Sequence, residues 1–172
     1  MLKFLGAVLV IISFGVIGTV LGRNLTKHTE ELRQFQFALS ALETEIVYAL
    51  TPLPQAFKIV AKQTKGVVAK FFTTVSQELN NGQGQTAGEA WSKTLAKIAP
   101  YLMLNEGDLS VLAQFGQGLG SSDREDQLKR LTGIKMQLAA REKAAELERG
   151  QFQKIWQTLG WACGLAVTLL FI

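Results

Sequence analysis

Residues 123–172 read DREDQLKRLTGIKMQLAAREKAAELERGQFQKIWQTLGWACGLAVTLLFI and contain no proline. Apolar side chains recur in this stretch every seven positions, at Leu131, Leu138, Ala145, Phe152 and Leu159. Such a period is typical of an α-helix, and no residue inside the stretch breaks one. The pattern predicts one long helix of about 75 Å, at about 1.5 Å per residue. We expect its charged part to pack on the protein and its apolar end to enter a membrane.

Charge is distributed unevenly along the 172 residues, although the net charge is only +4. Residues 4–22 and 155–172 carry no charge, whereas the middle holds all 14 acidic residues and every basic residue except Lys3. This mixed-charge middle is large enough to bury a small core. No basic run is interleaved with aromatic residues, so we expect no nucleic-acid partner. Proximity to anionic membrane lipid explains the small net positive charge better than a nucleic-acid partner does.

Both uncharged ends predict membrane helices. Residues 4–22 extend over about 28 Å of helix, close to the thickness of a bilayer core. A cleaved signal peptide is the alternative, but the apolar run exceeds the usual range of about 7–15 residues. Residues 155–172 extend over about 27 Å and place Trp156 and Trp161 as interface residues, unless these tryptophans belong to a core. The distribution of basic residues then puts the middle in the cytoplasm and both termini on the opposite side.

The middle predicts helices only. Residues 23–50 carry a second heptad seam, formed by Leu25, His28, Leu32, Phe35, Leu39, Leu42, Ile46 and Ala49. Pro52 and Pro54 end this helix, and helices are expected from about residue 55 to 65 and over residues 67–79. A capping box at Thr86 and Glu89 opens a fourth helix, which Pro100 ends, and a fifth covers residues 105–118.

These elements predict an all-α protein: a six-helix cytoplasmic bundle whose long first and last helices continue into two transmembrane segments. The domains are residues 1–22 (first membrane helix), 23–154 (bundle) and 155–172 (second membrane helix). Because both spans enter from one bundle, the two heptad seams should run antiparallel beside each other.

The sequence offers little for catalysis. Glu43 and Glu45 are two residues apart on a helix, so their carboxylates point to different faces. Each is expected on a solvated face or, alternatively, in polar contact with a partner or across the bundle. His28 is the one histidine and Cys163 the one cysteine; we expect a packed or snorkelling His28, and no metal or cofactor site. Ser122 and Asp123 fit a helix cap better than a nucleophile.

Two charged residues of the long last helix occupy heptad positions where apolar residues are expected. Arg141 and Glu148 should either pair with polar groups of the first helix or rotate outward. A buried pair of this kind sets the register of two helices more than it adds stability.

Several stretches together resemble the stage III sporulation protein AB family. They are Met1-Leu2-Lys3 before a glycine-bearing span and residues 39–46 (LSALETEI), 51–57 (TPLPQAF), 88–91 (GEAW) and 115–127 (FGQGLGSSDREDQ). The resemblance extends over the whole length in order. The proline-rich start, glycine loop and Ala-Trp helix are also similar to the cytoplasmic module of type II secretion inner-membrane platform proteins. Those proteins usually carry two such modules and three spans, whereas this chain has one module and two spans.

The resemblance implies a two-pass subunit of the sporulation channel between mother cell and forespore, with its bundle on the mother-cell side. The implied partners are a separate secretion-type ATPase and other membrane subunits of the channel. It implies no enzymatic activity and no catalytic residue. Expected contact residues are Glu43, Glu45, Arg124, Glu125 and Asp126. The alternatives are a membrane-anchored scaffold or signalling adaptor that dimerises through its amphipathic helices, and a membrane enzyme using His28.

Overall fold

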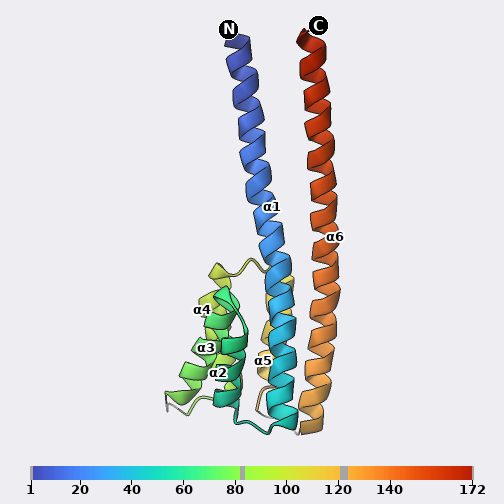
Figure 1. Ribbon diagram of the computed structural model, residues 1–172. Helices are drawn as coiled ribbons and strands as arrows, with labels where there is room; N and C mark the ends of the chain where they lie inside the picture. Colours follow the sequence, from blue (N-terminus) through green and yellow to red (C-terminus); the bar gives the residue numbers. More distant parts are fainter. Residues whose placement is uncertain (1, 82–83, 121–123, 172) are drawn as a thin grey trace. The chain divides into compact units, whose positions relative to one another are not determined.

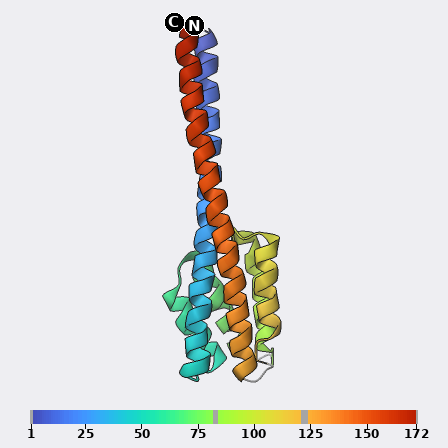
Figure 2. The ribbon, with the colours of Figure 1, turned by 90° about the vertical axis from the view of Figure 1, so that its right-hand side faces the viewer.

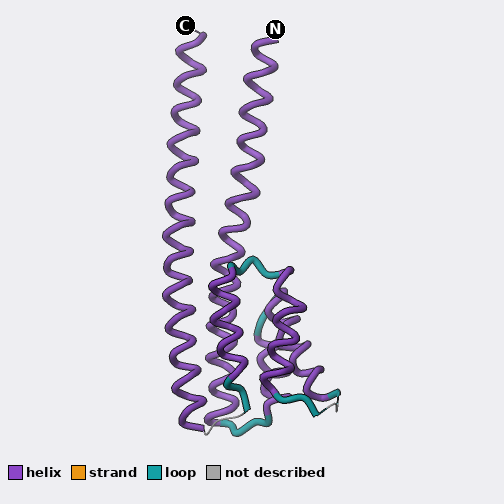
Figure 3. Tube along the Cα trace, turned by 180° about the vertical axis from the view of Figure 1, so that it is seen from behind, coloured by secondary structure: helices purple, strands orange, loops and turns teal. Residues whose placement is uncertain are grey.

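The computed structural model describes residues 2–81, 84–120 and 124–171, and these residues form helices joined by short loops (Figures 1 and 3). The elements in chain order are α1 (Leu2–Glu43), the π-helix η1 (Thr44–Tyr48), α2 (Leu53–Gln63), α3 (Gly66–Asn80), α4 (Ala87–Ile98), the 3₁₀-helix η2 (Ala99–Tyr101), α5 (Glu106–Gln117) and α6 (Arg124–Phe171). The prediction of an all-α protein with a long, unbroken last helix is confirmed for the described residues.

The chain divides into two compact units. One consists of Met1–Lys27 and Ala144–Ile172, in which a segment of α1 and a segment of α6 run in opposite directions (Figure 1). The other, His28–Lys143, contains the rest of both helices and all of α2 to α5. We call this second unit the bundle.

The two predicted spans, residues 1–22 and 155–172, fall on parts of α1 and α6 whose side chains, Ile155 apart, lie outside the described residues. Within the described part of the chain, no helix combines the length and the apolar character needed to cross a membrane.

Aromatic side chains form the centre of the bundle. Trp91 of α4 is fully buried, and its ring lies 4.7 Å from that of Phe71 and 4.9 Å from that of Phe115. Its indole Nε1 donates a hydrogen bond to the carbonyl oxygen of Leu112 over 2.8 Å, so the one polar atom of this side chain is satisfied in the core. This contact joins α4 to α5.

Two glycines allow α4 and α5 to approach closely at this point. A Cβ at Gly116 would lie 2.2 Å from Cδ1 of Trp91, and one at Gly88 would lie 2.7 Å from the carbonyl oxygen of Gly116. A side chain at either position would force its neighbour to shift. The spacing of α4 and α5 therefore depends on both glycines.

The two heptad seams meet inside the bundle as predicted. Leu32, Phe35, Leu39 and Leu42 of α1 are completely buried, and Leu131 and Leu138 of α6 are at most 1% exposed. In Figure 2 the α6 segment of the bundle lies beside α1 and α5. This arrangement closes the bundle with its own first and last helices.

The end of the α1 seam was predicted only in part. Ile46 is half-buried and lines a small pocket with Phe115 and Leu131, but the buried residue of this turn is Val47, and Ala49, expected on the seam, is exposed. The reason is η1, in which the amide of Ala49 donates to the carbonyl oxygen of Thr44, five residues earlier. This wider turn brings Val47, the fifth residue after Leu42, into the core and turns Ala49 out of the seam.

Leu50 follows this turn in the left-handed region, with φ of 55°. The amide of Thr51 then donates to the carbonyl oxygen of Glu45 over 2.8 Å. Leu50 thus occupies a conformation usually reserved for glycine at the end of a helix, while its side chain is 68% exposed.

Side-chain caps fix the starts of α4 and α5. The predicted capping box is confirmed: Thr86 accepts from the amide of Glu89, and the Glu89 carboxylate accepts from the amide of Thr86. The predicted cap around Ser122 lies outside the described residues. A box that was not predicted opens α5, formed by Asn105 and Asp108.

Candidate functional site

The bundle contains a buried polar site centred on Asp108, and the site begins with the capping box of α5. Oδ2 of Asp108 accepts from the amide of Asn105 over 3.0 Å, and Oδ1 of Asn105 accepts from the amide of Asp108 over 2.9 Å. The sequence dictates this local geometry, because short polar side chains three residues apart satisfy the free amides of a helix start. A carboxylate at this position also suits the positive end of the helix dipole.

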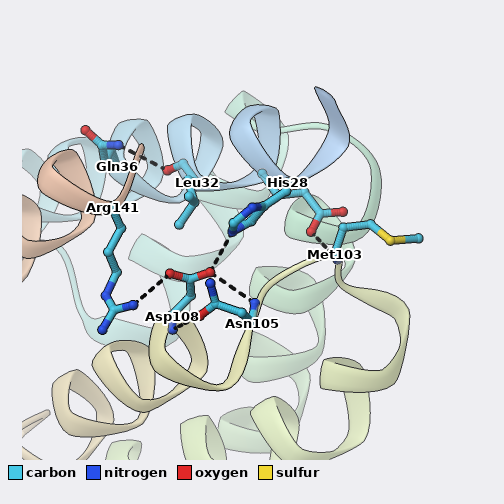
Figure 4. Close-up of polar contacts among 8 residues, drawn as sticks. His28, Leu32, Gln36, Met103, Asn105, Asp108 and Arg141 are labelled. Atoms are coloured by element: carbon cyan, nitrogen blue, oxygen red, sulfur yellow. Dashed lines mark hydrogen bonds and ion pairs between the residues drawn. The ribbon is translucent and has the colours of Figure 1, made fainter. Parts of the chain in front are cut away.

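Two further elements reach the same carboxylate (Figure 4). Nε2 of His28, from α1, lies 2.7 Å from Oδ2, and Nη1 of Arg141, from α6, donates to Oδ1 over 3.2 Å. Asp108 is only 1% exposed, so its charge depends on these partners. The site therefore ties α1, α5 and α6 together at one point, and we call it the Asp108 tie.

Two more polar contacts join α1 to α6 across the seam. The carboxylate of Glu142 accepts from Nε of Arg33 over 2.8 Å and from the side-chain Nε2 of Gln36 over 2.6 Å. Further along, Nζ of Lys135 donates to Glu43. As the residue number falls along α1 it rises along α6, which confirms that the two seams run antiparallel in the bundle.

The chemistry of these contacts is that of helix-to-helix links. The oxygens of Asp108 accept from His28, Arg141 and the Asn105 amide, all groups of this chain. Among the described residues, no group of three or more His, Cys, Asp or Glu side chains could hold a metal ion. The arrangement fixes the register of three helices, and buried polar groups of this kind are best attested in that role.

Of the five predicted contact residues, Glu43 and Glu45 are the two whose side chains the structure describes. Glu43 is 16% exposed and pairs with Lys135 across the bundle, so the predicted alternative of a contact inside the protein holds for it. Glu45, on η1, accepts from the Thr51 hydroxyl over 2.7 Å. Arg124, Glu125 and Asp126 begin α6, but their side chains lie outside the described residues.

Other predictions about single residues have mixed outcomes. His28 is packed as predicted, with its ring held by Asp108. Arg141 was expected to pair with the first helix or to rotate outward, and this was wrong, because its partner is Asp108 of α5. Glu148 is exposed.

Sequence reasoning missed Asp108, although a signal for it exists. Asn105 and Asp108 have the spacing of a capping box, and the sole histidine falls on the α1 seam. Arg141 is a charge at a seam position of α6. A buried carboxylate would satisfy both residues, but only the folding of the chain shows which acid supplies it.

The fold and its polar links define a class: an all-helical bundle protein whose charged side chains join its helices to one another. The chain belongs to the stage III sporulation protein AB family, whose model matches residues 3–172. This confirms the resemblance drawn from the sequence. The family is one of sporulation proteins.

Two relatives agree with this assignment. The chain is 35% identical over 172 residues to stage III sporulation protein AB of Bacillus subtilis (strain 168), and the match covers all of both chains. A solved structure of stage III sporulation protein AB (SpoIIIAB) is similar with a TM-score of 0.69 at 35% identity. That similarity covers 73% of this chain and 98% of the solved one.

Proposed function

We propose that this protein is a non-enzymatic membrane platform subunit of a secretion-like sporulation channel between mother cell and forespore. Residues 1–22 and 155–172 span the cell membrane, with the bundle in the mother-cell cytoplasm and both termini on the opposite side. The bundle docks a cytoplasmic secretion-type ATPase, and the protein anchors other membrane subunits of the channel.

One observation carries this proposal. α1 and α6 each run without a break from an uncharged end of the sequence into the charged middle. A continuous helix satisfies its own backbone hydrogen bonds in lipid. Basic residues follow the first uncharged stretch and precede the second, as Arg23 and Lys27 and as Arg149 and Lys154, and this pattern favours a cytoplasmic middle.

The turn at the end of α1 supports a docking role. Tyr48 and Leu50 are 72% and 68% exposed, and Glu45 lies on the same π-helix. π-turns and left-handed non-glycine residues both concentrate at functional sites. We therefore assign the turn formed by residues 45–50 to the ATPase contact, with Glu45 as its charged residue and Tyr48 and Leu50 as its apolar ones.

Co-purification of the full-length protein with the ATPase tests this assignment. Glu45→Lys should weaken binding by about fivefold, the effect of losing a charge contact of about 1 kcal/mol. The matched control is the double change Glu43→Lys with Lys135→Glu, which exchanges two charges inside the bundle and should leave binding unchanged. Normal binding by Glu45→Lys would remove this residue from the contact.

Topology is tested separately by labelling of single cysteines with a membrane-impermeant reagent. In vegetative cells that produce the Cys163→Ser protein, the proposal expects cysteines placed in the bundle, for example at Ser92, to be protected. It expects cysteines placed before residue 4 to be labelled from outside. Labelling of the bundle position from outside would contradict the proposed orientation.

A scaffold or signalling adaptor that dimerises through its amphipathic helices is the second candidate. The α1 seam is already covered within one chain, since Gln36 and Arg33 bind Glu142 and Lys135 binds Glu43. Light scattering of the purified full-length protein separates the two candidates. A stable monomer favours the platform, whereas a stable dimer favours the adaptor.

A further inference from the structure

A groove of about 160 Å³ lies between α5 and α6. Two of its lining residues, Phe115 and Ile134, are apolar and only 5% exposed, so they form its floor. The others are polar or lack a side chain: Gln114, Arg130, Gln137 and Gly133.

Arginines of α6 lie over glycines at the two ends of α5. A Cβ at Gly107 would lie 2.5 Å from Nη1 of Arg141, and one at Gly118 would lie 2.8 Å from Nη1 of Arg130. These two contacts join α5 to α6 at either end. The groove lies between them, and Arg130 borders it at the Gly118 end.

No contact within this chain requires a glycine at position 133. It lies in the interior of α6, where glycine weakens a helix relative to alanine. Unlike Gly88 and Gly116, it approaches nothing, because a Cβ there would meet no atom within 4 Å. A glycine that leaves open space on a groove wall allows another backbone to approach from outside the chain.

The chemistry of the groove specifies its occupant. A cavity of about 150 Å³ with apolar walls holds a benzene-sized group, so there is room here for one large apolar side chain. None of the groove's described lining residues is acidic, and Arg130 supplies a guanidinium that pairs with carboxylates in a planar geometry. The side-chain amides of Gln114 and Gln137 add donors and acceptors at the rim.

We propose that the groove between α5 and α6 binds an acidic amphipathic helix of another subunit. An apolar side chain of that helix covers Phe115 and Ile134, a carboxylate binds Arg130, and the helix backbone passes close to Gly133. This is the helix-in-groove mode of recognition. It rests on the proposed function only in that the protein works inside a multi-subunit complex.

The test is photo-crosslinking in sporulating cells that produce the full-length chain. A photoreactive phenylalanine is placed at Gln137, on the groove rim, and at Ala139, an exposed position on the opposite face of the same helix. We expect Gln137 to crosslink to a helix of another subunit that carries Asp or Glu, and Ala139 to give at least tenfold less of that product. A product formed with a second copy of this chain would overturn the proposal.

Substitutions test whether the Gln137 crosslink depends on binding in the groove. Gly133→Leu fills it and Arg130→Glu reverses its charge, and each should reduce the Gln137 product at least tenfold. Ala139→Leu and Lys143→Glu are the matched controls and should leave it unchanged. Replacing the crosslinked acid of the partner by Lys should restore the product in Arg130→Glu. Thermal melting by circular dichroism confirms that each variant is folded, and an undiminished product in folded Gly133→Leu and Arg130→Glu would overturn the proposal.

The failure of this inference is distinguishable from that of the proposed function. If a probe at Tyr48 captures the ATPase while one at Gln137 captures nothing, the groove proposal falls and the platform role stands. If the Gln137 product forms, is lost in Arg130→Glu and returns when the partner's acid is replaced by Lys, the groove proposal stands. If in the same cells no ATPase co-purifies, the ATPase docking falls.

Discussion

Arg141 donates to Asp108 from a different helix, with Nη1 3.2 Å from Oδ1. Its Nη1 also lies 2.5 Å from the position that a Cβ of Gly107 would take. A residue at a heptad position of α6 therefore leaves the seam and crosses to the start of α5. This crossing, together with His28, holds α1, α5 and α6 in one register.

Asp108→Asn should lower the free energy of unfolding by about 3 kcal/mol, because it leaves Arg141 and His28 without a buried anion. Urea unfolding followed by circular dichroism measures this change. Glu106→Gln, an exposed change on the same helix, should alter it by less than about 0.5 kcal/mol. Equal stabilities of the two variants would mean that the Asp108 tie contributes nothing.

Gly116→Ala should destabilise the bundle by about 2 kcal/mol, because the new methyl group would overlap the ring of Trp91. Gly133→Ala is the matched change on α6, where the methyl group has open space, and it should raise stability by about 0.5–1 kcal/mol. Thermal melting of both variants should give shifts of opposite sign. A melting temperature of Gly116→Ala at or above that of the parent would contradict the close approach of α4 and α5.

Leu50→Gly should raise the stability of the bundle by up to about 1 kcal/mol, since it relieves a left-handed residue that costs about 1–2 kcal/mol. Part of this gain is offset by the greater freedom of glycine in the unfolded chain. Leu50→Ala keeps the strain and should give no gain in urea unfolding. If the turn is the ATPase contact, the stabilised Leu50→Gly should bind that partner more weakly than the parent.

Exchanging the charges of Glu43 and Lys135 should reveal their coupling. Each single reversal places two like charges together and should destabilise the bundle, whereas the double reversal should recover about 1 kcal/mol of the loss. Urea unfolding of the four proteins gives this coupling free energy directly. Strict additivity of the single effects would show that the pair contributes no stability.

Local signals in the sequence predicted much of the fold. Thr86 and Glu89 form a cap that depends only on residues three apart, and the buried leucines of both seams follow the 3.6-residue period of a helix. The failure at Ala49 has a physical cause, because a π-turn changes that period and the sequence carries no strong mark of it. The left-handed conformation at the end of this helix was not predicted either, because position 50 is a leucine and not the glycine that usually indicates it.

The candidate site was less predictable because it depends on tertiary contacts. Asp108 and Arg141 lie 33 residues apart, and His28 lies 80 residues from Asp108. No one of these residues indicates the site by itself, because the packing of the three helices is what brings them together. The α5–α6 groove was not predictable for the same reason, since the open space beside Gly133 exists only in the folded bundle.

The π-turn has a consequence for how the length of this protein can vary. Such a turn is an α-helix that accommodates one residue more than its period allows. Removing one residue from Thr44–Tyr48 would bring Val47 to the fourth position after Leu42, where an ordinary α-helix keeps it on the seam. The end of α1 is thus a position at which a single insertion or deletion can be absorbed without moving the core of the bundle.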